Sequence, residues 1–267
     1  MARYQIIIAY DGTHFQGFQR QGSSRTVQAE VEAALRSLGW QDESILYAGR
    51  TDSGVHAMGQ VIAFDLNWHH TPQQLLKALN ASLPEDVAAR SVQVVRNDFH
   101  PRYHALARQY LYRLYCEEER DPLRERYMWR VWPEVQAELL HQAANRLLGE
   151  HDFAAFGSPL RPGGSTIRRV YRAEWQQTAK KEWTFRITAN AFLYRMVRRL
   201  VFLQVRVGQQ QLSLEQFEAA LQIPQPLLPG LAKPNGLYLE WVQYEENDLK
   251  SEGLIKTLSV SGEEDCG

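Results

Sequence analysis

The order of the elements predicted in the first 95 residues restricts the fold more than any other feature of this sequence. Apolar runs bounded by turn residues predict strands, and apolar residues at helical spacing predict helices between them. Thr71 and Gln74 form a capping box at the start of the second helix, and Pro84 ends it. The strands are predicted at residues 3–11, 45–50, 60–66 and 87–95, and the helices at residues 27–38 and 71–83. This order of strand, helix, strand, strand, helix, strand predicts an α+β fold of the ferredoxin, or split β-α-β, type.

The remainder of the chain repeats this element order with longer insertions. Strands are predicted at residues 108–115, 169–176, 182–189 and 237–244, and helices at residues 134–148, 192–207 and a short segment capped by Ser213. We therefore expect two ferredoxin-like domains, residues 1–105 and residues 106–247. Residues 248–267 are acidic and without periodicity, so we expect a disordered tail.

Several classes of protein are excluded by the composition. The sequence has no run of about 18 apolar residues that could span a bilayer and no signal-peptide pattern, so we expect a cytoplasmic location. Its two cysteines, Cys116 and Cys266, are far apart, which excludes a disulfide framework. No Cys-x-x-Cys or helical histidine pair is present, so we expect neither a metal nor another cofactor.

The net charge of −1 hides a segregation of charge along the chain. Residues 96–206 hold 20 basic and 12 acidic side chains, whereas residues 217–267 hold 3 and 9. Arginine outnumbers lysine 24 to 6, and the planar guanidinium matches phosphate oxygens and stacks on bases. The basic middle of the chain suits a nucleic acid, although a solvated basic face would give the same counts.

The carboxylate best placed for catalysis is Asp52, in the segment Gly49–Ala57. It follows a predicted strand and lies among small residues, which let another chain approach the backbone closely. A plain Asx turn before Gly54 is the structural alternative. Arg50 lies two residues earlier, and if strand geometry continues, both side chains share a face on which the cation would keep the carboxylate ionised. Such a carboxylate can act as nucleophile or base.

Arginines and tyrosines alternate along the strand predicted at residues 108–115. Arg108, Tyr110 and Tyr112 share one face of it. Aromatic rings stack on unpaired bases and guanidinium groups hold phosphates, so this face suits RNA. Ordinary tyrosines packed on a core are the structural alternative.

The helix predicted at residues 192–207 has a basic face opposite an apolar one. Its basic face consists of Arg195, Arg198, Arg199 and Arg206. Most such faces are solvated, although Arg198 could turn inward and pair with a carboxylate. In the loop after the first predicted strand, Phe15 and Phe18 are unusual in so polar a segment, and we expect them to contact a ligand or the other domain.

Six segments, in order along the chain, resemble the motifs of one family, tRNA pseudouridine synthase A (TruA). They are Tyr10–Gln19, Gly49–Ala57, Phe99–Tyr112, His151–Phe153, Asn190–Arg198 and Gly236–Leu239. The resemblance covers nearly the whole chain, from Arg3 to about Tyr244. It implies two ferredoxin-like halves with a joined, mixed or antiparallel sheet, and an active-site cleft between them.

The resemblance also implies a role for each of five residues. Asp52 matches the catalytic aspartate, and Arg198 matches the basic residue that pairs with it. Arg50 matches the arginine associated with flipping the target nucleotide out of its stack. Tyr110 matches the tyrosine that stacks on the uracil, and Leu237 matches an apolar wall of the same pocket.

The activity implied by the resemblance is isomerisation of uridine to pseudouridine at positions 38–40 in the anticodon stem-loop of tRNA. It further implies a homodimer that needs neither metal nor cofactor. Two other functions share part of the pattern. One is a non-catalytic RNA-binding protein or chaperone, which gives no reason for Asp52 beside Arg50 in a glycine-flanked loop. The other is a glycosidase or nucleosidase with a single catalytic carboxylate, which would release free base from RNA.

Overall fold

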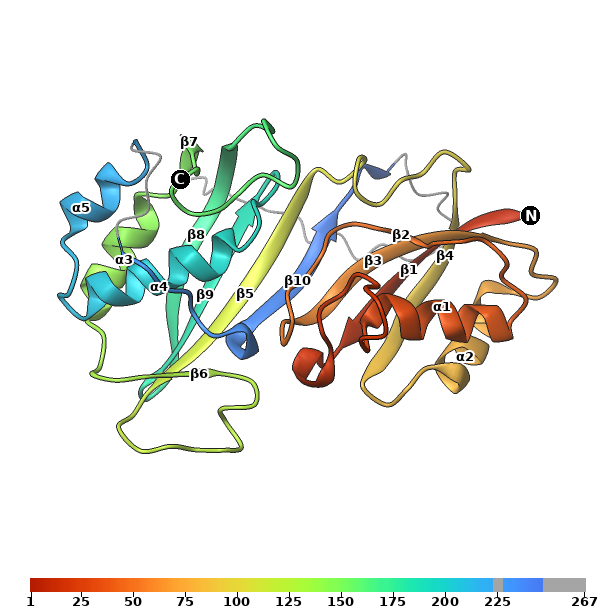
Figure 1. The fold of residues 1–267 in the computed structure, drawn as a ribbon, viewed down its shortest axis with the longest axis horizontal. Coiled ribbons are helices and arrows are strands. Elements are labelled where there is room, and N and C mark those ends of the chain that lie inside the picture. Colours follow the sequence, from red (N-terminus) through yellow and green to blue (C-terminus); the bar gives the residue numbers. More distant parts are fainter. Residues whose placement is uncertain (223–227, 247–267) are drawn as a thin grey trace, which may run out of the picture.

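The structure, a computed structural model, describes residues 1–222 and 228–246. One ten-stranded sheet runs along the molecule, and helices cover each half of it (Figure 1). Nearly all neighbouring strands of its main path are antiparallel. The α+β class predicted from the sequence is confirmed. Residues 248–267, for which we expected a disordered tail, and Cys266 lie outside the described residues.

The N-terminal half contains four strands and two helices. They are β1 (Ala2–Tyr10), α1 (Val27–Ser37), β2 (Leu46–Tyr47), β3 (His56–Leu66), α2 (Pro72–Ser82) and β4 (Val87–Val95), with a 3₁₀ turn η1 (Gly12–His14). The strands lie in the order β4-β1-β3, and β2 pairs with β3. The predicted capping box is present, since the side chain of Thr71 accepts from the Gln74 amide and the Gln74 side chain accepts from the Thr71 amide.

The C-terminal half has the same order of principal elements. It comprises β5 (Ala107–Cys116), β6 (Trp129–Val131), α3 (Ala137–Asn145), β7 (Gly149–Asp152), β8 (Ile167–Ala179), β9 (Glu182–Ala189), α4 (Met196–Gly208), α5 (Leu214–Ala219), η2 (Pro234–Gly236) and β10 (Leu237–Gln243). Its strands lie in the order β10-β5-β9-β8-β7. The short strands β6 and β7 were not predicted. The capping box at Ser213 and Gln216 is present.

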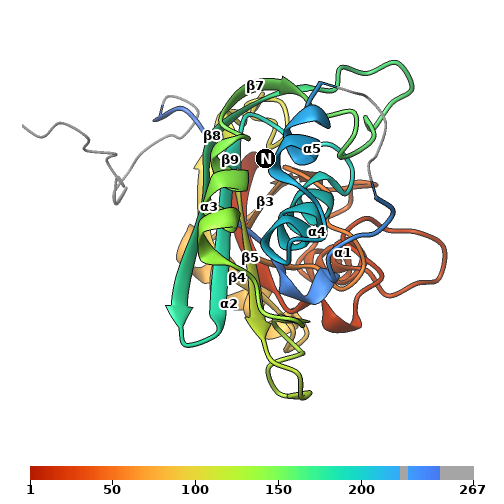
Figure 2. The same ribbon diagram turned by 90° about the vertical axis from the view of Figure 1, so that its left-hand side faces the viewer.

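The last strand, β10, joins the two halves. It pairs with β5 in antiparallel fashion and with β3 in parallel, where Tyr238 lies opposite His56. Leu237 and Leu239 project from one face of β10; Leu237 enters the core of the C-terminal half and Leu239 that of the N-terminal half. Both cores therefore lie on the same side of the sheet, and Figure 2 shows α1 and α4 together on that side.

The helix predicted from Phe192 begins only at Met196. Arg195 precedes it with left-handed backbone angles (φ 62, ψ 7), which an α-helix cannot include. The basic face predicted for this helix is wrong in two respects: Arg195 is outside the helix, and Arg199 is only 6% exposed. Almost every residue of α4 is buried against β5, β9 and neighbouring helices, so this helix belongs to the core.

Within residues 1–222 and 228–246, no helix is long and apolar enough to cross a membrane. No group of three or more His, Cys, Asp or Glu side chains in these ranges is placed to hold a metal ion. Cys116 is buried in the core of the C-terminal half.

Candidate active site

Asp52 lies in the loop between β2 and β3, and the loop after β1 supports it from beneath. The amide of Phe18 donates to the carbonyl of Thr51 (3.1 Å), and the amide of Gly54 donates to the carbonyl of Phe15 (3.3 Å). The hydroxyls of Tyr10 and Thr51 are hydrogen-bonded at 2.8 Å in the interior. The backbone on both sides of Asp52 is thereby fixed.

Two glycines allow these loops to approach so closely. A Cβ on Gly12 would lie 2.0 Å from the carbonyl oxygen of Val55. Gly17 has φ +88, and a Cβ there would lie 2.9 Å from the carbonyl oxygen of Thr51. No other residue fits either position without displacing the loop that carries Asp52.

The carboxylate of Asp52 pairs with Arg198, in the first turn of α4. Nη1 of Arg198 donates to Oδ2 of Asp52 at 2.8 Å, and Nε donates to the carbonyl of Ala232 at 2.9 Å. The two side chains are 19% and 13% exposed. The inward turn of Arg198, which the sequence left open, is present. A guanidinium held at two points orients the carboxylate as well as balancing its charge.

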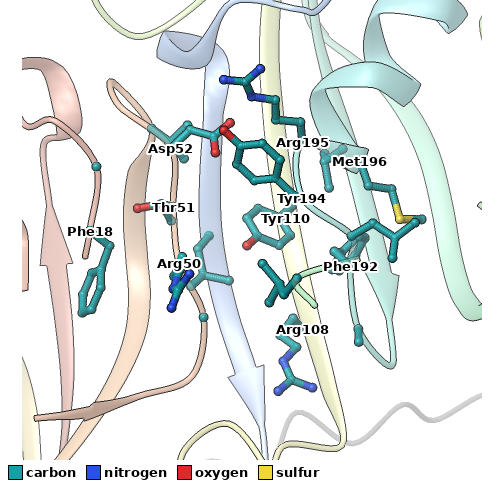
Figure 3. A pocket seen from close by; sticks show the side chains of 18 of the residues that line it. Phe18, Arg50, Thr51, Asp52, Arg108, Tyr110, Phe192, Tyr194, Arg195 and Met196 are labelled. Carbon is teal, nitrogen blue, oxygen red and sulfur yellow. The ribbon is translucent and has the colours of Figure 1, made fainter. Parts of the chain in front are cut away.

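Asp52 faces a cavity of about 980 Å³ between the two halves. Strands β5 and β10 form its floor through Tyr110, Leu237 and Leu239; the Asp52 loop forms one wall, and residues 191–198 form the opposite wall. Figure 3 shows Asp52 on one wall, with Tyr194 and Arg195 facing it from the other. This volume is at the upper end of typical ligand sites, so it suits a flipped nucleotide together with part of the chain that carries it.

Tyr110 and Leu237 lie on the floor of this cavity, as the resemblance implied. Tyr110 is partly buried, and its ring meets the ring of Phe192 edge to face at 5.0 Å. Burial raises the pKa of Tyr110 to about 12, and the nearby Asp52 adds to this shift, so the phenol stays neutral at physiological pH. Leu237 is 6% exposed and supplies an apolar surface beside it. A flat, neutral, partly apolar floor of this kind accommodates a pyrimidine ring.

Arg50 lines the same cavity but is not the partner of Asp52. Its Nε donates weakly to the hydroxyl of Tyr47 (3.4 Å), and Figure 3 shows its side chain directed away from the carboxylate. Strand geometry does not continue beyond Tyr47, so the expectation that Arg50 and Asp52 share a strand face is wrong. Arg50 remains exposed and available to a ligand.

The lining of the cavity is strongly cationic. Among the residues that the structure describes, its one carboxylate is that of Asp52, and its basic side chains are Arg50, Arg102, Arg108, Arg161, Arg168, Arg195 and Arg198. Within the described residues, only Arg198 among these arginines forms an ion pair. By contrast, many arginines elsewhere in these ranges are paired, such as Arg3 with Asp65. A cavity whose arginines lack counter-charges attracts a polyanion.

Arg108 and Arg168 are partly buried guanidinium groups whose hydrogen bonds go to carbonyl oxygens. Arg108 donates to the carbonyls of Arg102, Ala105 and Asn190, and Arg168 to those of Ser165 and Ile167. Burial lowers the pKa of both below the usual arginine value, although both stay cationic at neutral pH. An anion that enters the cavity would supply the negative charge that these two guanidinium groups lack among the described residues.

Other residues named from the sequence have structural roles. Tyr112 is fully buried and its hydroxyl donates to the carbonyl of Lys233 (2.7 Å). Phe15 and Phe18 are 1% and 0% exposed and pack in the N-terminal core. Phe18 also backs the cavity wall. The alternative of an ordinary core aromatic thus holds for Tyr112. The expectation that Phe15 contacts a ligand or the other domain is wrong, because Phe15 packs in the N-terminal core and does not line the cavity.

Sequence reasoning missed one wall of the cavity, residues 159–168. Pro159, Leu160 and Arg161 line it together with Arg168. The Pro- and Gly-rich composition of this segment indicated a loop, but nothing in it indicated which part of the fold the loop would cover. Tyr194 was also overlooked as a cavity residue, because it was placed within the predicted helix.

Comparison with known proteins adds an independent line of evidence. A family model described as tRNA pseudouridine synthase matches residues 6–104 and 143–245. A tRNA pseudouridine synthase A of Lactiplantibacillus plantarum is 36% identical over 95% of this chain and 98% of its own length. That of Geobacillus kaustophilus is 39% identical over 92% of this chain and 96% of its own length.

Solved structures resemble the chain only distantly. A chain of a Cbf5-Nop10-Gar1 complex is 14% identical, with a TM-score of 0.34 over 76% of this chain and 45% of that one. A likeness at this level carries no argument about function.

Proposed function

The chain belongs to the tRNA pseudouridine synthase family, and we propose that Asp52 is the residue that catalyses the family's reaction. The protein is an isomerase that converts uridine in tRNA to pseudouridine. The observation that carries the assignment is the position of Asp52, which among residues 1–222 and 228–246 is the one carboxylate in the lining of a cavity with seven arginines.

The reaction uses a carboxylate and consumes no second substrate, because the uridine is rearranged into its isomer. The N1 glycosidic bond breaks, the uracil turns, and C5 forms a bond to C1′. A carboxylate can attack C1′, add to C6 of the base, or remove a sugar proton to give a glycal. Arg198 holds the Asp52 carboxylate in one orientation through a 2.8 Å hydrogen bond, and each of these steps needs an oriented carboxylate.

Tyr110, Leu237 and Arg50 receive the target nucleotide in this proposal. A uridine must leave its stack before Asp52 can reach it, at a cost of a few kcal/mol. Tyr110 stacks on the flipped uracil and Leu237 packs against its edge, since both lie on the floor of the cavity. Arg50 is exposed at the mouth and stabilises the flipped state by filling the gap left in the RNA.

We extend the proposal to the site of modification, the assembly and the location. The six motifs that resemble tRNA pseudouridine synthase A support uridines 38–40 of the anticodon stem-loop as targets. They also support a homodimer acting in the cytoplasm. The repeated strand order, β4-β1-β3 in one half and β10-β5-β9-β8 in the other, supports two ferredoxin-like domains meeting near residue 105.

The decisive experiment compares Asp52→Asn with the unaltered enzyme on tRNA labelled with tritium at C5 of uridine. We expect Asp52→Asn to bind tRNA and to release no tritium, because an amide can neither attack nor accept a proton. Asp65→Asn is the matched control, since Asp65 is also an ion-paired aspartate, with Arg3 at 2.6 Å, but lies outside the cavity. Substantial tritium release by Asp52→Asn would overturn the assignment.

The same assay separates the rival functions. A non-catalytic RNA-binding protein would release no tritium in any form of the chain. A nucleosidase would leave free uracil and an abasic site, whereas an isomerase retains the base as pseudouridine within the chain. Mapping pseudouridine in tRNA from cells lacking the protein identifies the target positions directly.

A further inference from the structure

Two cavity residues, Tyr194 and Arg195, have no part in holding Asp52, and the backbone that presents them is unusual. Arg195 occupies the N-cap position of α4 with φ 62 and ψ 7, and its side chain makes no capping hydrogen bond. This left-handed conformation is unfavourable for most L residues; glycine and asparagine adopt it more readily. An arginine in this conformation lowers the stability of the fold, and the N-cap position does not require an arginine. Backbone strain of this kind concentrates at functional positions.

The conformation of this segment is imposed by its neighbours. The amide of Tyr194 donates to the carbonyl of Ser158 at 2.9 Å, and that of Ser158 donates to the carbonyl of Tyr194 at 3.4 Å. Gly157 lies so close that a Cβ there would be 2.7 Å from the carbonyl oxygen of Tyr194. These contacts fix the backbone that carries the side chains of Tyr194 and Arg195.

The side chains of Tyr194 and Arg195 form a stacked pair that faces the cavity. The guanidinium carbon of Arg195 lies 4.7 Å from the centre of the Tyr194 ring. Tyr194 is 44% exposed, more than any other aromatic side chain among the described residues of the cavity lining. Within the described residues, Arg195 has no carboxylate partner and the Tyr194 hydroxyl has no hydrogen bond. Figure 3 shows the pair across the cavity from Asp52.

We propose that Tyr194 and Arg195 form a stacking platform for the nucleotide adjacent to the target uridine. The proposal rests on the function proposed above. Once the target flips, the neighbouring base loses a stacking partner, and an exposed ring backed by a guanidinium replaces it. Tyr110 lies at the floor, partly buried against Phe192, and is occupied by the target base, whereas Tyr194 lies opposite Asp52 on the wall.

The chemistry of the platform predicts how it discriminates among substrates. Every base has a π-face, so stacking on tyrosine and arginine tolerates any neighbouring base. The cationic edge of Arg195 also favours the phosphate that joins the two nucleotides. The platform therefore contributes affinity for RNA without restricting the sequence around the target.

The test measures tRNA affinity and thermal stability for Tyr194→Leu, Tyr194→Phe and Arg195→Asn. We expect Tyr194→Leu and Arg195→Asn to weaken tRNA binding about tenfold and Tyr194→Phe to retain it, because the ring alone stacks. The melting temperature of Arg195→Asn stays level or rises, since asparagine suits the left-handed backbone. The matched control is Lys181→Asn, which removes one positive charge at another left-handed position (φ 65) in the turn between β8 and β9, outside the cavity.

A second substrate identifies the platform's ligand. Transcripts carrying an abasic nucleotide on one side or the other of the target uridine remove the neighbouring base. One of them should bind the unaltered enzyme about tenfold less well and bind Tyr194→Leu with no further loss. Additive losses for both transcripts, or intact-tRNA affinity equal to that of the unaltered enzyme in both Tyr194→Leu and Arg195→Asn, would overturn the proposal.

The outcome is separable from a failure of the proposed function. Pseudouridine formation by the unaltered enzyme, and its loss in Asp52→Asn, test that function without involving Tyr194 or Arg195. An active enzyme whose Tyr194→Leu variant binds every transcript normally keeps its function and loses only the platform.

Discussion

Asp52 and Arg198 lie 146 residues apart in the chain, and 2.8 Å separates their carboxylate and guanidinium. The aspartate comes from the loop before β3 in the N-terminal half, and the arginine from the first turn of α4 in the C-terminal half. Their ion pair therefore crosses the cavity and forms only when the halves are joined. Since both side chains are mostly buried, salt screens the pair weakly.

Replacing Arg198 by lysine tests whether orientation or charge matters more. Lysine keeps the charge but cannot contact both Asp52 and the carbonyl of Ala232 with a planar fork. We expect kcat to fall by about 10- to 100-fold and tRNA affinity to change little. The control is Arg199→Lys on the same helix, which contacts the carbonyl of Gly230 outside the cavity and should leave kcat nearly unchanged. Equal kcat for both variants would contradict a positioning role.

Tyr10→Phe removes the hydrogen bond beneath the Asp52 loop. Tyr10 and Thr51 are 5% and 8% exposed, so the substitution leaves the Thr51 hydroxyl without its partner at a cost of about 1–3 kcal/mol. We expect lower stability to urea and lower kcat, with KM nearly constant. Tyr4→Phe, on the same strand, provides the comparison because the Tyr4 hydroxyl has no hydrogen bond within the described residues. A Tyr10→Phe enzyme with normal stability and kcat would show that the bond does not matter.

Asp11 gives the stability of the fold a defined pH dependence. Burial alone would raise its pKa, but hydrogen bonds from Thr13, Tyr127 and Arg126 lower it well below the usual value of an aspartate. A lowered pKa means that the ionised group stabilises the fold above the unfolded-state pKa and that this stabilisation is lost as the pH falls through the lowered value.

Asp11→Asn should consequently be destabilised by about 2 kcal/mol at pH 7, with a deficit that shrinks below about pH 4. Urea unfolding at several pH values measures this difference. A deficit that is constant from pH 7 to pH 3 would indicate that packing rather than charge is responsible.

The unpaired arginines of the cavity predict the salt dependence of tRNA binding. Arg168→Gln should weaken binding and lower the slope of log affinity against log salt by about one, the value for one lost phosphate contact. The neighbouring Arg169 is the control, because it lies 3.8 Å from Glu150 and outside the cavity. An unchanged slope in Arg168→Gln would exclude a phosphate contact at this position.

Local signals in the sequence predicted the elements that depend on local chemistry. The capping box at Thr71 and Gln74 indicated the start of α2, and the apolar spacing after Val27 indicated α1 within one residue at its end. Asp52 could be chosen as the candidate carboxylate because its small-residue loop and strand context are contiguous in the chain. The pairing of Asp52 with Arg198 was implied by the resemblance to the family but not by helical spacing, which does not determine which side of α4 faces a distant loop.

Features produced by long-range packing were beyond prediction. Apolar residues at helical spacing continue through Phe192 and Leu193, but the bridge between Ser158 and Tyr194 holds that segment out of the helix. The same pattern placed Arg199 on the basic face of the helix. In the fold Arg199 is buried, and its guanidinium donates to the carbonyl of Gly230. In both cases a contact remote in sequence outweighs the local preference.

The placement of β10 between β3 and β5 has a consequence for how the protein is made. The two half-sheets can be joined only after the ribosome has synthesised β10, which begins at Leu237. Until then, the stretches of β3 and β5 that pair with β10, residues 56–57 and 107–112, are open to other chains. Premature termination or proteolysis before Leu237 would thus remove part of the cavity floor together with the strand that joins the half-sheets, leaving two aggregation-prone halves with no shared cavity.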